Sequence, residues 1–248
     1  MYYFASDIHL GAGDRHTARL TENRFCSWLD HVSADAEAIY LVGDIFDFWF
    51  EYRRVVPKGF TRTLGKLSEL SDRGIGIHLF TGNHDMWCRD YLQEECGIHL
   101  HLHPEEITLA GQRLFIAHGD NLNIKGQPML RLMNAGFRST TVRALFSWLV
   151  HPDLALKFGK WWSSKSRKSH GSQPIDVSHL DFLIEYARTR KSERTEIDAF
   201  IFGHMHLPHD YDRDGLRVLF MSDWSGEQAS YIALDDSGQL SIKTFDLR

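Results

Sequence analysis

The chain has 248 residues, of which 43% are hydrophobic, and a net charge of −5. This is enough for one complete core plus an insertion, and it excludes an intrinsically disordered protein. No run approaches the length of a membrane span, and neither a basic leader nor a cleavable apolar stretch follows Met1, so we expect a cytoplasmic protein. The three cysteines lack a C-x-x-C pair, which predicts reduced thiols.

Apolar runs and helical spacing alternate along the chain. Helices are predicted over about 17–33 and 60–72, where apolar residues recur at helical spacing. Buried strands are predicted at 3–5, 38–42, 76–81, 114–117 and 199–202, and further strands at 106–109, 216–220, 228–234 and 240–245. We therefore predict an α/β fold, a four-layer α/β/β/α sandwich of two sheets flanked by helices, in a single domain over 1–248.

Residues that can bind metal ions follow five of these strands. The segments are Asp7-Ile8-His9, Gly43-Asp44, Gly82-Asn83-His84-Asp85, Ala117-His118-Gly119-Asp120 and Gly203-His204-Met205-His206. They supply enough oxygen and nitrogen donors for two ions. Because the strands would deliver their donors from their C-terminal ends, we expect one sheet edge to carry the whole site.

The donor types indicate a catalytic site. Carboxylates, imidazoles and one amide oxygen, without a thiolate, suit Mn²⁺, Fe²⁺ or Zn²⁺ better than a structural zinc. A carboxylate can bridge two such ions, and paired ions stabilise both the attacking and the leaving oxygen of a displacement at phosphorus. Asp44 is the candidate for that bridge.

These five segments, in this order, resemble the pattern of the calcineurin-like metallophosphoesterases: D-x-H, G-D, G-N-H-[DE], a lone His and G-H-x-H. The resemblance implies the same sandwich fold and two divalent ions, most typically Mn²⁺. It assigns one ion to Asp7, His9, Asp44 and His206, and the other to Asp44, Asn83, His118 and His204. It also implies that His84 contacts the scissile phosphate as a non-ligand acid and that Asp85 orients its ring.

The specificity of this pattern lies in the ordered set. A single D-x-H or H-x-H arises often by chance, whereas five ordered matches with glycine before Asp44, Asn83 and His204 do not; we expect these glycines to let the backbone turn tightly. A degenerate relative that kept only the fold would have lost ligands, and none is missing. Three alternating histidines, His99, His101 and His103, are better explained by a solvated strand face than by a further metal site.

A basic segment separates His118 from His204. Residues 121–170 hold nine basic side chains and one acidic residue, Asp153, so the rest of the chain is correspondingly acidic. The segment is also rich in aromatic and aliphatic residues at helical spacing. We expect an amphipathic helical cap at about 122–190 that contacts a membrane surface or shelters an acyl chain. The alternative is a helical subdomain that packs its apolar face on the core and leaves its basic face solvated.

A cap that is both basic and apolar resembles one branch of the family, the UDP-2,3-diacylglucosamine pyrophosphohydrolases of lipid A synthesis. The resemblance covers nearly the whole chain, including Ser6–Leu10, Gly43–Trp49 and His118–Leu122. It implies hydrolysis of a lipid-linked nucleotide sugar to UMP and 2,3-diacylglucosamine 1-phosphate, at the cytoplasmic face of the inner membrane. The best-known members have an arginine where this chain has His84. Candidate phosphate or sugar contacts in the cap are Ser164, Lys165, Arg167 and Lys168.

Three other functions remain open from the sequence. The first is a phosphodiesterase or phosphatase that acts on soluble nucleotides or other phosphoesters. The second is a nuclease that uses the basic cap, although the acidic remainder of the chain makes nucleic acid an unfavourable partner. The third is a non-catalytic, membrane-associated scaffold. The sequence leaves the oligomeric state open.

Overall fold

The computed structural model describes residues 1–122, 126, 128–170 and 176–246. Within the helices of the central segment, the description does not extend to a few side chains, namely those of Leu130, Arg131, Met133, Arg138, Lys160 and residues 164–170.

The first sheet has six strands in the order β11-β10-β1-β2-β3-β4. Its parallel half consists of β1 (Tyr2–Ala5), β2 (Ala38–Val42), β3 (Gly76–Phe80) and β4 (His99–His101). The C-terminal hairpin of β10 (Gln228–Leu234) and β11 (Leu240–Asp246) joins antiparallel to β1, with Phe4 opposite Ile232. The central strands β1 and β2 are apolar throughout, as expected of strands covered on both faces, whereas β3 and the edge strand β4 carry His78, His99 and His101.

The second sheet has five strands in the order β5-β6-β7-β9-β8. Here β6 (Gln112–Ala117), β7 (Ala199–Phe202) and β9 (Leu216–Phe220) are parallel. The edge strands β5 (Glu105–Leu109) and β8 (His209–Arg213) pair antiparallel with their neighbours. The strands predicted at 106–109 and 114–117 thus form a hairpin across Ala110-Gly111.

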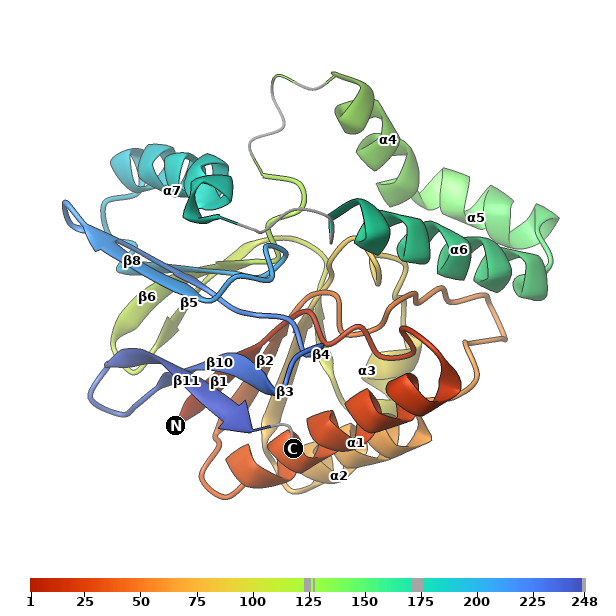
Figure 1. Ribbon diagram of the computed structural model, residues 1–248, viewed down its shortest axis with the longest axis horizontal. Coiled ribbons are helices and arrows are strands. Elements are labelled where there is room, and N and C mark those ends of the chain that lie inside the picture. The colour runs from red at the N-terminus through yellow and green to blue at the C-terminus, as the bar shows by residue number, and fades with distance from the viewer. Residues whose placement is uncertain (123–125, 127, 171–175, 247–248) are drawn as a thin grey trace.

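Three apolar clusters define the four layers, because successive side chains of a strand point to opposite faces. On β2, Ile39 and Leu41 pack against Trp28 of α1 (Arg15–Val32) and the helices beside it. Tyr40 and Val42, in contrast, face the second sheet. The far side of that sheet packs on α7 (Asp181–Glu193). The predicted α/β/β/α sandwich is confirmed, with α1, α2 (Thr61–Asp72) and α3 (Tyr91–Cys96) on one side (Figure 1).

Three helices stand together outside the sandwich: α4 (Pro128–Arg138), α5 (Thr140–Leu149) and α6 (Pro152–His170) (Figure 1). We call these three helices the cap. Trp87 Nε1 donates to the carbonyl oxygen of Phe137 at 2.6 Å, and Tyr52 Oη donates to that of Val150 at 2.9 Å. The cap therefore contacts the loops that follow β2 and β3, and these loops also carry candidate metal ligands.

The expected insertion at about 122–190 extends further than the cap. Leu183, Ile184 and Ala187 of α7 are buried against the second sheet, so α7 is the outer layer of the sandwich.

Among the described residues, no helix combines the length and the apolar character needed to cross a bilayer. Two cysteines, Cys88 and Cys96, are buried and unpaired, as predicted for reduced thiols.

Candidate metal centre

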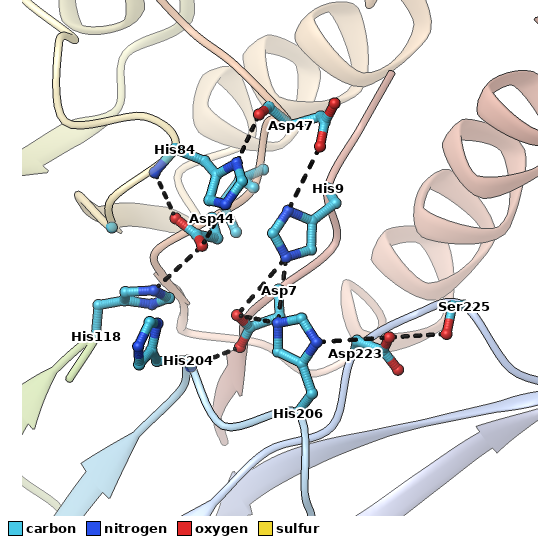
Figure 2. A network of polar contacts seen from close by, with 12 residues as sticks. Asp7, His9, Asp44, Asp47, His84, His118, His204, His206, Asp223 and Ser225 are labelled. Carbon is cyan, nitrogen blue, oxygen red and sulfur yellow. Dashed lines mark hydrogen bonds and ion pairs between the residues drawn. The ribbon is translucent and has the colours of Figure 1, made fainter. Parts of the chain in front are cut away.

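The candidate ligands come from both sheets. Asp7, His9, Asp44 and Asn83 follow β1, β2 and β3 of the first sheet, whereas His118, His204 and His206 follow β6 and β7 of the second. The expectation of a single sheet edge was therefore wrong: the two sheets are packed face to face, and their strand ends meet across the interface. Figure 2 shows the side chains converging from both sides.

One group of ligand atoms consists of Asp7, His9 and His206, whose donor atoms lie within 4.8 Å of one another. His206 Nε2 is 3.2 Å from Asp7 Oδ1 and 3.3 Å from His9 Nε2. Asp7 and His9 are buried, while the side chain of His206 is 28% exposed. The group is thus enclosed on the side of the core and open on the side of His206.

A second group consists of Asp44, His118 and His204, again within 4.8 Å. His118 Nε2 lies 3.3 Å from Asp44 Oδ2, and His118 Nδ1 bonds the carbonyl oxygen of Val42 at 2.9 Å. Because that carbonyl can only accept, Nδ1 carries the proton and Nε2 is left as the donor for an ion. Asp44 also groups with His9 and His84, so its carboxylate lies between the two sets.

The surroundings shift the pKa values of the candidate ligands. Burial would raise the pKa of Asp7, but His206 holds it at about 2; burial would likewise raise the pKa of Asp44, which His118 keeps well below its usual range. Burial lowers the pKa of His9 to about 3 and that of His204 to about 4. Burial would lower the pKa of His118 and of His206, but Asp44 raises the first well above its usual value and Asp7 raises the second. Ionised carboxylates and neutral imidazoles are the forms that bind divalent ions, so ion binding releases protons from these two histidines.

Several buried polar atoms here lack a hydrogen bond. Asp7 Oδ1, Asn83 Oδ1 and His118 Nε2 have none among the residues that the structure describes. A buried acceptor without a partner costs free energy, and native proteins rarely leave several together. All three belong to the candidate ligand set, so the residues present fit a pair of divalent cations.

The backbone explains how strand ends direct these side chains inward. Five candidate ligands have left-handed φ values between 49° and 68°, namely Asp7, His9, Asp44, His204 and His206. The neighbouring glycines mainly provide space: a Cβ on Gly82 would lie 2.2 Å from Asp44 Oδ1, and one on Gly203 would lie 2.9 Å from Asp7 Oδ2. The expectation that both of these glycines make the turn was wrong, since neither has a positive φ.

His84 lies beside both ligand groups. Its Nε2 is 3.8 Å from Asp44 Oδ2, and its Nδ1 bonds the carbonyl oxygen of Asp47 at 2.7 Å. The expectation that Asp85 orients the His84 ring was wrong. Asp85 is fully buried and accepts from the backbone amides of Gly82 at 2.7 Å and Ile45 at 2.8 Å. It therefore joins the loop that carries Asn83 to the loop that carries Asp44.

Sequence reasoning missed Asp47, which connects the site to the cap. Its Oδ1 accepts from Ser163 Oγ of α6 at 2.5 Å and lies 3.9 Å from His9 Nδ1. Its signals in the sequence were its position three residues after Asp44 and its place within Gly43–Trp49, one of the segments that carry the resemblance. The side chains of the predicted substrate contacts Ser164, Lys165, Arg167 and Lys168 lie outside the described part of the structure.

A cavity of about 280 Å³ lies between the cap and the site. Its floor includes Asn83, His84 and His204. Its walls are mainly aromatic: Phe48, Trp49, Trp87, Phe137, Phe146, Phe158 and Trp162. One continuous space therefore joins an apolar surface to the polar centre.

The strand ends of two packed sheets bring together two groups of candidate ligands around one shared carboxylate. This fold and this site define a metal-dependent phosphoester hydrolase. The family model for calcineurin-like phosphoesterases matches residues 2–208. The chain belongs to this family.

Proteins named UDP-2,3-diacylglucosamine hydrolase are among its relatives. That of Porphyromonas gingivalis is 40% identical over 236 residues, which are 90% of this chain and 89% of the relative. Those of Neisseria gonorrhoeae and Haemophilus influenzae are 27% and 23% identical over 97% of this chain and 96% and 97% of their own lengths. An archaeal phosphodiesterase of known structure is a more distant likeness, with 13% identity, a TM-score of 0.48, and coverage of 98% of this chain and 99% of its own.

Proposed function

We propose that the protein hydrolyses the pyrophosphate of UDP-2,3-diacylglucosamine to UMP and 2,3-diacylglucosamine 1-phosphate. The observation that carries this proposal is the aromatic cavity under the cap, because its floor is formed by Asn83, His84 and His204. A substrate that is acylated at one end and phosphorylated a few bonds away can fill both parts of that space. The printed name of the relative that is 40% identical supports the same substrate.

The proposal assigns two divalent ions to the ligand groups. Asp7, His9, Asp44 and His206 hold one ion, and Asp44, Asn83, His118 and His204 hold the other, as the clustering of these side chains supports. Such a pair supplies Lewis acidity to a phosphoryl oxygen and lowers the pKa of water. The absence of thiolates from the set favours Mn²⁺, with Fe²⁺ or Zn²⁺ as the alternatives.

His84 assists departure of the acylated sugar phosphate. Its Nδ1 donates to the carbonyl oxygen of Asp47, which fixes the plane of the ring. His84 also lines the cavity under the cap, so the ring lies on the side where this proposal places the leaving group. A protonated ring then gives the Nε2 proton to the leaving oxygen, or stabilises its charge.

The outer surface of the cap is proposed to rest on the cytoplasmic face of the inner membrane. Trp148 is 82% exposed, and Met129, Leu132, Leu149 and Leu154 are each more than half exposed. An apolar group of this size on a basic segment is typical of peripheral contact with anionic lipid. The same contact would bring the acylated substrate to the cavity.

The first test is release of UMP from UDP-2,3-diacylglucosamine by purified protein, with Mn²⁺ and after EDTA treatment. An Asp44→Ala variant is the control, because its loss removes a ligand of both ions. We expect metal-dependent release by the wild type and at least a thousandfold less by Asp44→Ala. Cleavage of bis(p-nitrophenyl) phosphate without any UMP release from the lipid would retain a phosphoesterase and refute this substrate.

A further inference from the structure

A second cavity, of about 420 Å³, lies on the other side of the candidate metal centre. Asp7, His9 and His206 form its inner end. Its outer walls are the N-terminal half of α1 and the loop at 223–225 between β9 and β10. Its volume is within the range of about 300–1,000 Å³ that is common for small-molecule sites. Nothing in the reaction scheme above occupies it.

The wall formed by α1 is a single helical stripe. Thr17, Leu20, Thr21 and Arg24 follow the i, i+3, i+4, i+7 spacing of one helix face and all line the cavity. Thr21 Oγ donates to the carbonyl oxygen of Thr17 at 3.1 Å, so its hydroxyl oxygen can still accept. The stripe thus offers one apolar side chain, two hydroxyls and one cation.

Two donors at this cavity have no acceptor. Arg24 Nη1 donates to the carbonyl oxygen of Gly226 at 3.4 Å, but its Nε is buried without a partner, and no carboxylate pairs with Arg24 among the described residues. The indole Nε1 of Trp224, a fully buried side chain that also lines the cavity, is unpartnered as well. Both nitrogens are shielded from water, so a ligand in the cavity would meet Arg24 at the outer nitrogens of its guanidinium group. A cation without a carboxylate partner favours a ligand that presents acceptors.

The opposite wall carries an acceptor. Asp223 Oδ2 accepts from Ser225 Oγ at 2.7 Å and lies 3.7 Å from His206 Nδ1. A carboxylate beside a hydroxyl group suits the two hydroxyls of a ribose. Figure 2 shows Asp223 and Ser225 on one side of the polar network and His84, Asp44 and His118 on the other.

The reaction geometry assigns the two cavities. In a displacement at phosphorus, the leaving group departs opposite the attacking oxygen, and the group that is retained lies to the side. With the acylated sugar phosphate placed on the side of His84, the retained half of the substrate needs a separate polar space. We infer that the cavity between α1 and the loop at 223–225 binds the nucleoside half of the substrate, an inference that rests on the proposed function.

In this arrangement, Arg24 donates to carbonyl oxygens of the base and Asp223 accepts from the ribose hydroxyls. Leu20, which is 40% exposed, provides an apolar surface for the base. The residues that recognise the nucleotide are therefore separate from the cap that recognises the acyl chains.

The test is the affinity of the Mn²⁺-loaded protein for UMP, measured by titration calorimetry beside inorganic phosphate. Arg24→Gln removes the cation and Thr21→Phe fills the cavity, so each tests a different property of the site. Arg19→Gln is the matched control, because Arg19 lies on the opposite side of α1 and pairs with Glu22 at 3.4 Å. Thermal melting of each variant checks that it is folded.

We expect both cavity variants to bind UMP at least tenfold more weakly, with a smaller change for phosphate, and Arg19→Gln to match the wild type. UMP binding that is no tighter than phosphate binding, or that is unchanged in both folded cavity variants, would overturn the inference. A wild type that binds UMP through Arg24 yet releases none from UDP-2,3-diacylglucosamine would instead refute the proposed function alone. The two failures are thereby distinguished.

Discussion

Gly159 allows α6 of the cap to approach the loop that follows Asp44. A Cβ built on Gly159 would lie 2.3 Å from Phe48 Cε1 and 2.4 Å from Cδ1 and Cζ. Phe48 is a wall of the cavity under the cap and cannot withdraw without changing it. Gly159→Ala therefore tests whether the cap is held at this distance.

The expected change in the stability of Gly159→Ala follows from two opposing effects. Alanine in place of glycine inside a helix stabilises by about 1 kcal/mol, whereas forcing a methyl group into a packed contact costs about 1–3 kcal/mol. Gly136 of α4 is the matched control, because nothing lies within 4 Å of a Cβ at that position. The difference between the two alanine variants isolates the cost of the contact with Phe48.

The assay combines urea unfolding with kinetics. We expect Gly136→Ala to be as stable as the wild type or more so, and Gly159→Ala to be less stable than Gly136→Ala by about 1–3 kcal/mol. The KM for the acylated substrate should rise in Gly159→Ala more than that for bis(p-nitrophenyl) phosphate. Equal stability of the two variants would refute the packing of α6 on Phe48.

Two further predictions concern protonation and membrane contact. Burial, together with the nearby His101 and His99, lowers the pKa of His78 from 6.5 to about 4. As the pH falls from 6.5 to 4, His78 therefore takes up a proton in the unfolded chain but not in the folded protein, and the folded protein becomes less stable. Discounted for the partial exposure of His78, the free energy of unfolding should fall by ~1–2 kcal/mol over this pH range. Urea unfolding in EDTA should show a smaller fall for His78→Gln than for the wild type. Equal falls in the two proteins would contradict the lowered pKa of His78. In co-sedimentation, Trp148→Ser should bind anionic vesicles several-fold more weakly than the wild type. Val55→Ser is the control, because Val55 is 47% exposed but lies outside the cap, and its binding should not change. Equal binding by the two variants would exclude Trp148 from the membrane contact.

The candidate ligand residues could be proposed from the sequence because each lies next to an apolar run that ends in a short polar motif, and the structure brings six of them into two groups. The origin of His118 and His204 in a second sheet could not, because a strand's apolar run does not say which neighbours it pairs with. The partner of the His84 ring was equally hidden, since it is a backbone carbonyl and leaves no trace in residue type.

Contacts between segments that are distant in the sequence account for the other differences between the expectations and the structure. Ser163 and Asp47 are 116 positions apart, and only the docking of α6 brings them together. His101 was expected on a solvated face, yet its Nε2 lies 3.0 Å from His78 Nδ1, and its Nδ1 lies 2.9 Å from Glu105. The alternation correctly placed His99 and His101 on one side of β4, where both stack on His78.

The origin of the ligands in two sheets also constrains how the chain folds. Asp7 and His206 are separated by 199 positions in the sequence, so neither ligand group is complete until the two sheets have packed together. Contacts between residues so far apart in the sequence form slowly, because the intervening chain loses conformational entropy before the free energy of the contacts offsets that loss. A folding intermediate with only the first sheet formed would hold a partial set of donors. We therefore expect both candidate ligand groups to be completed late in folding rather than at its nucleation.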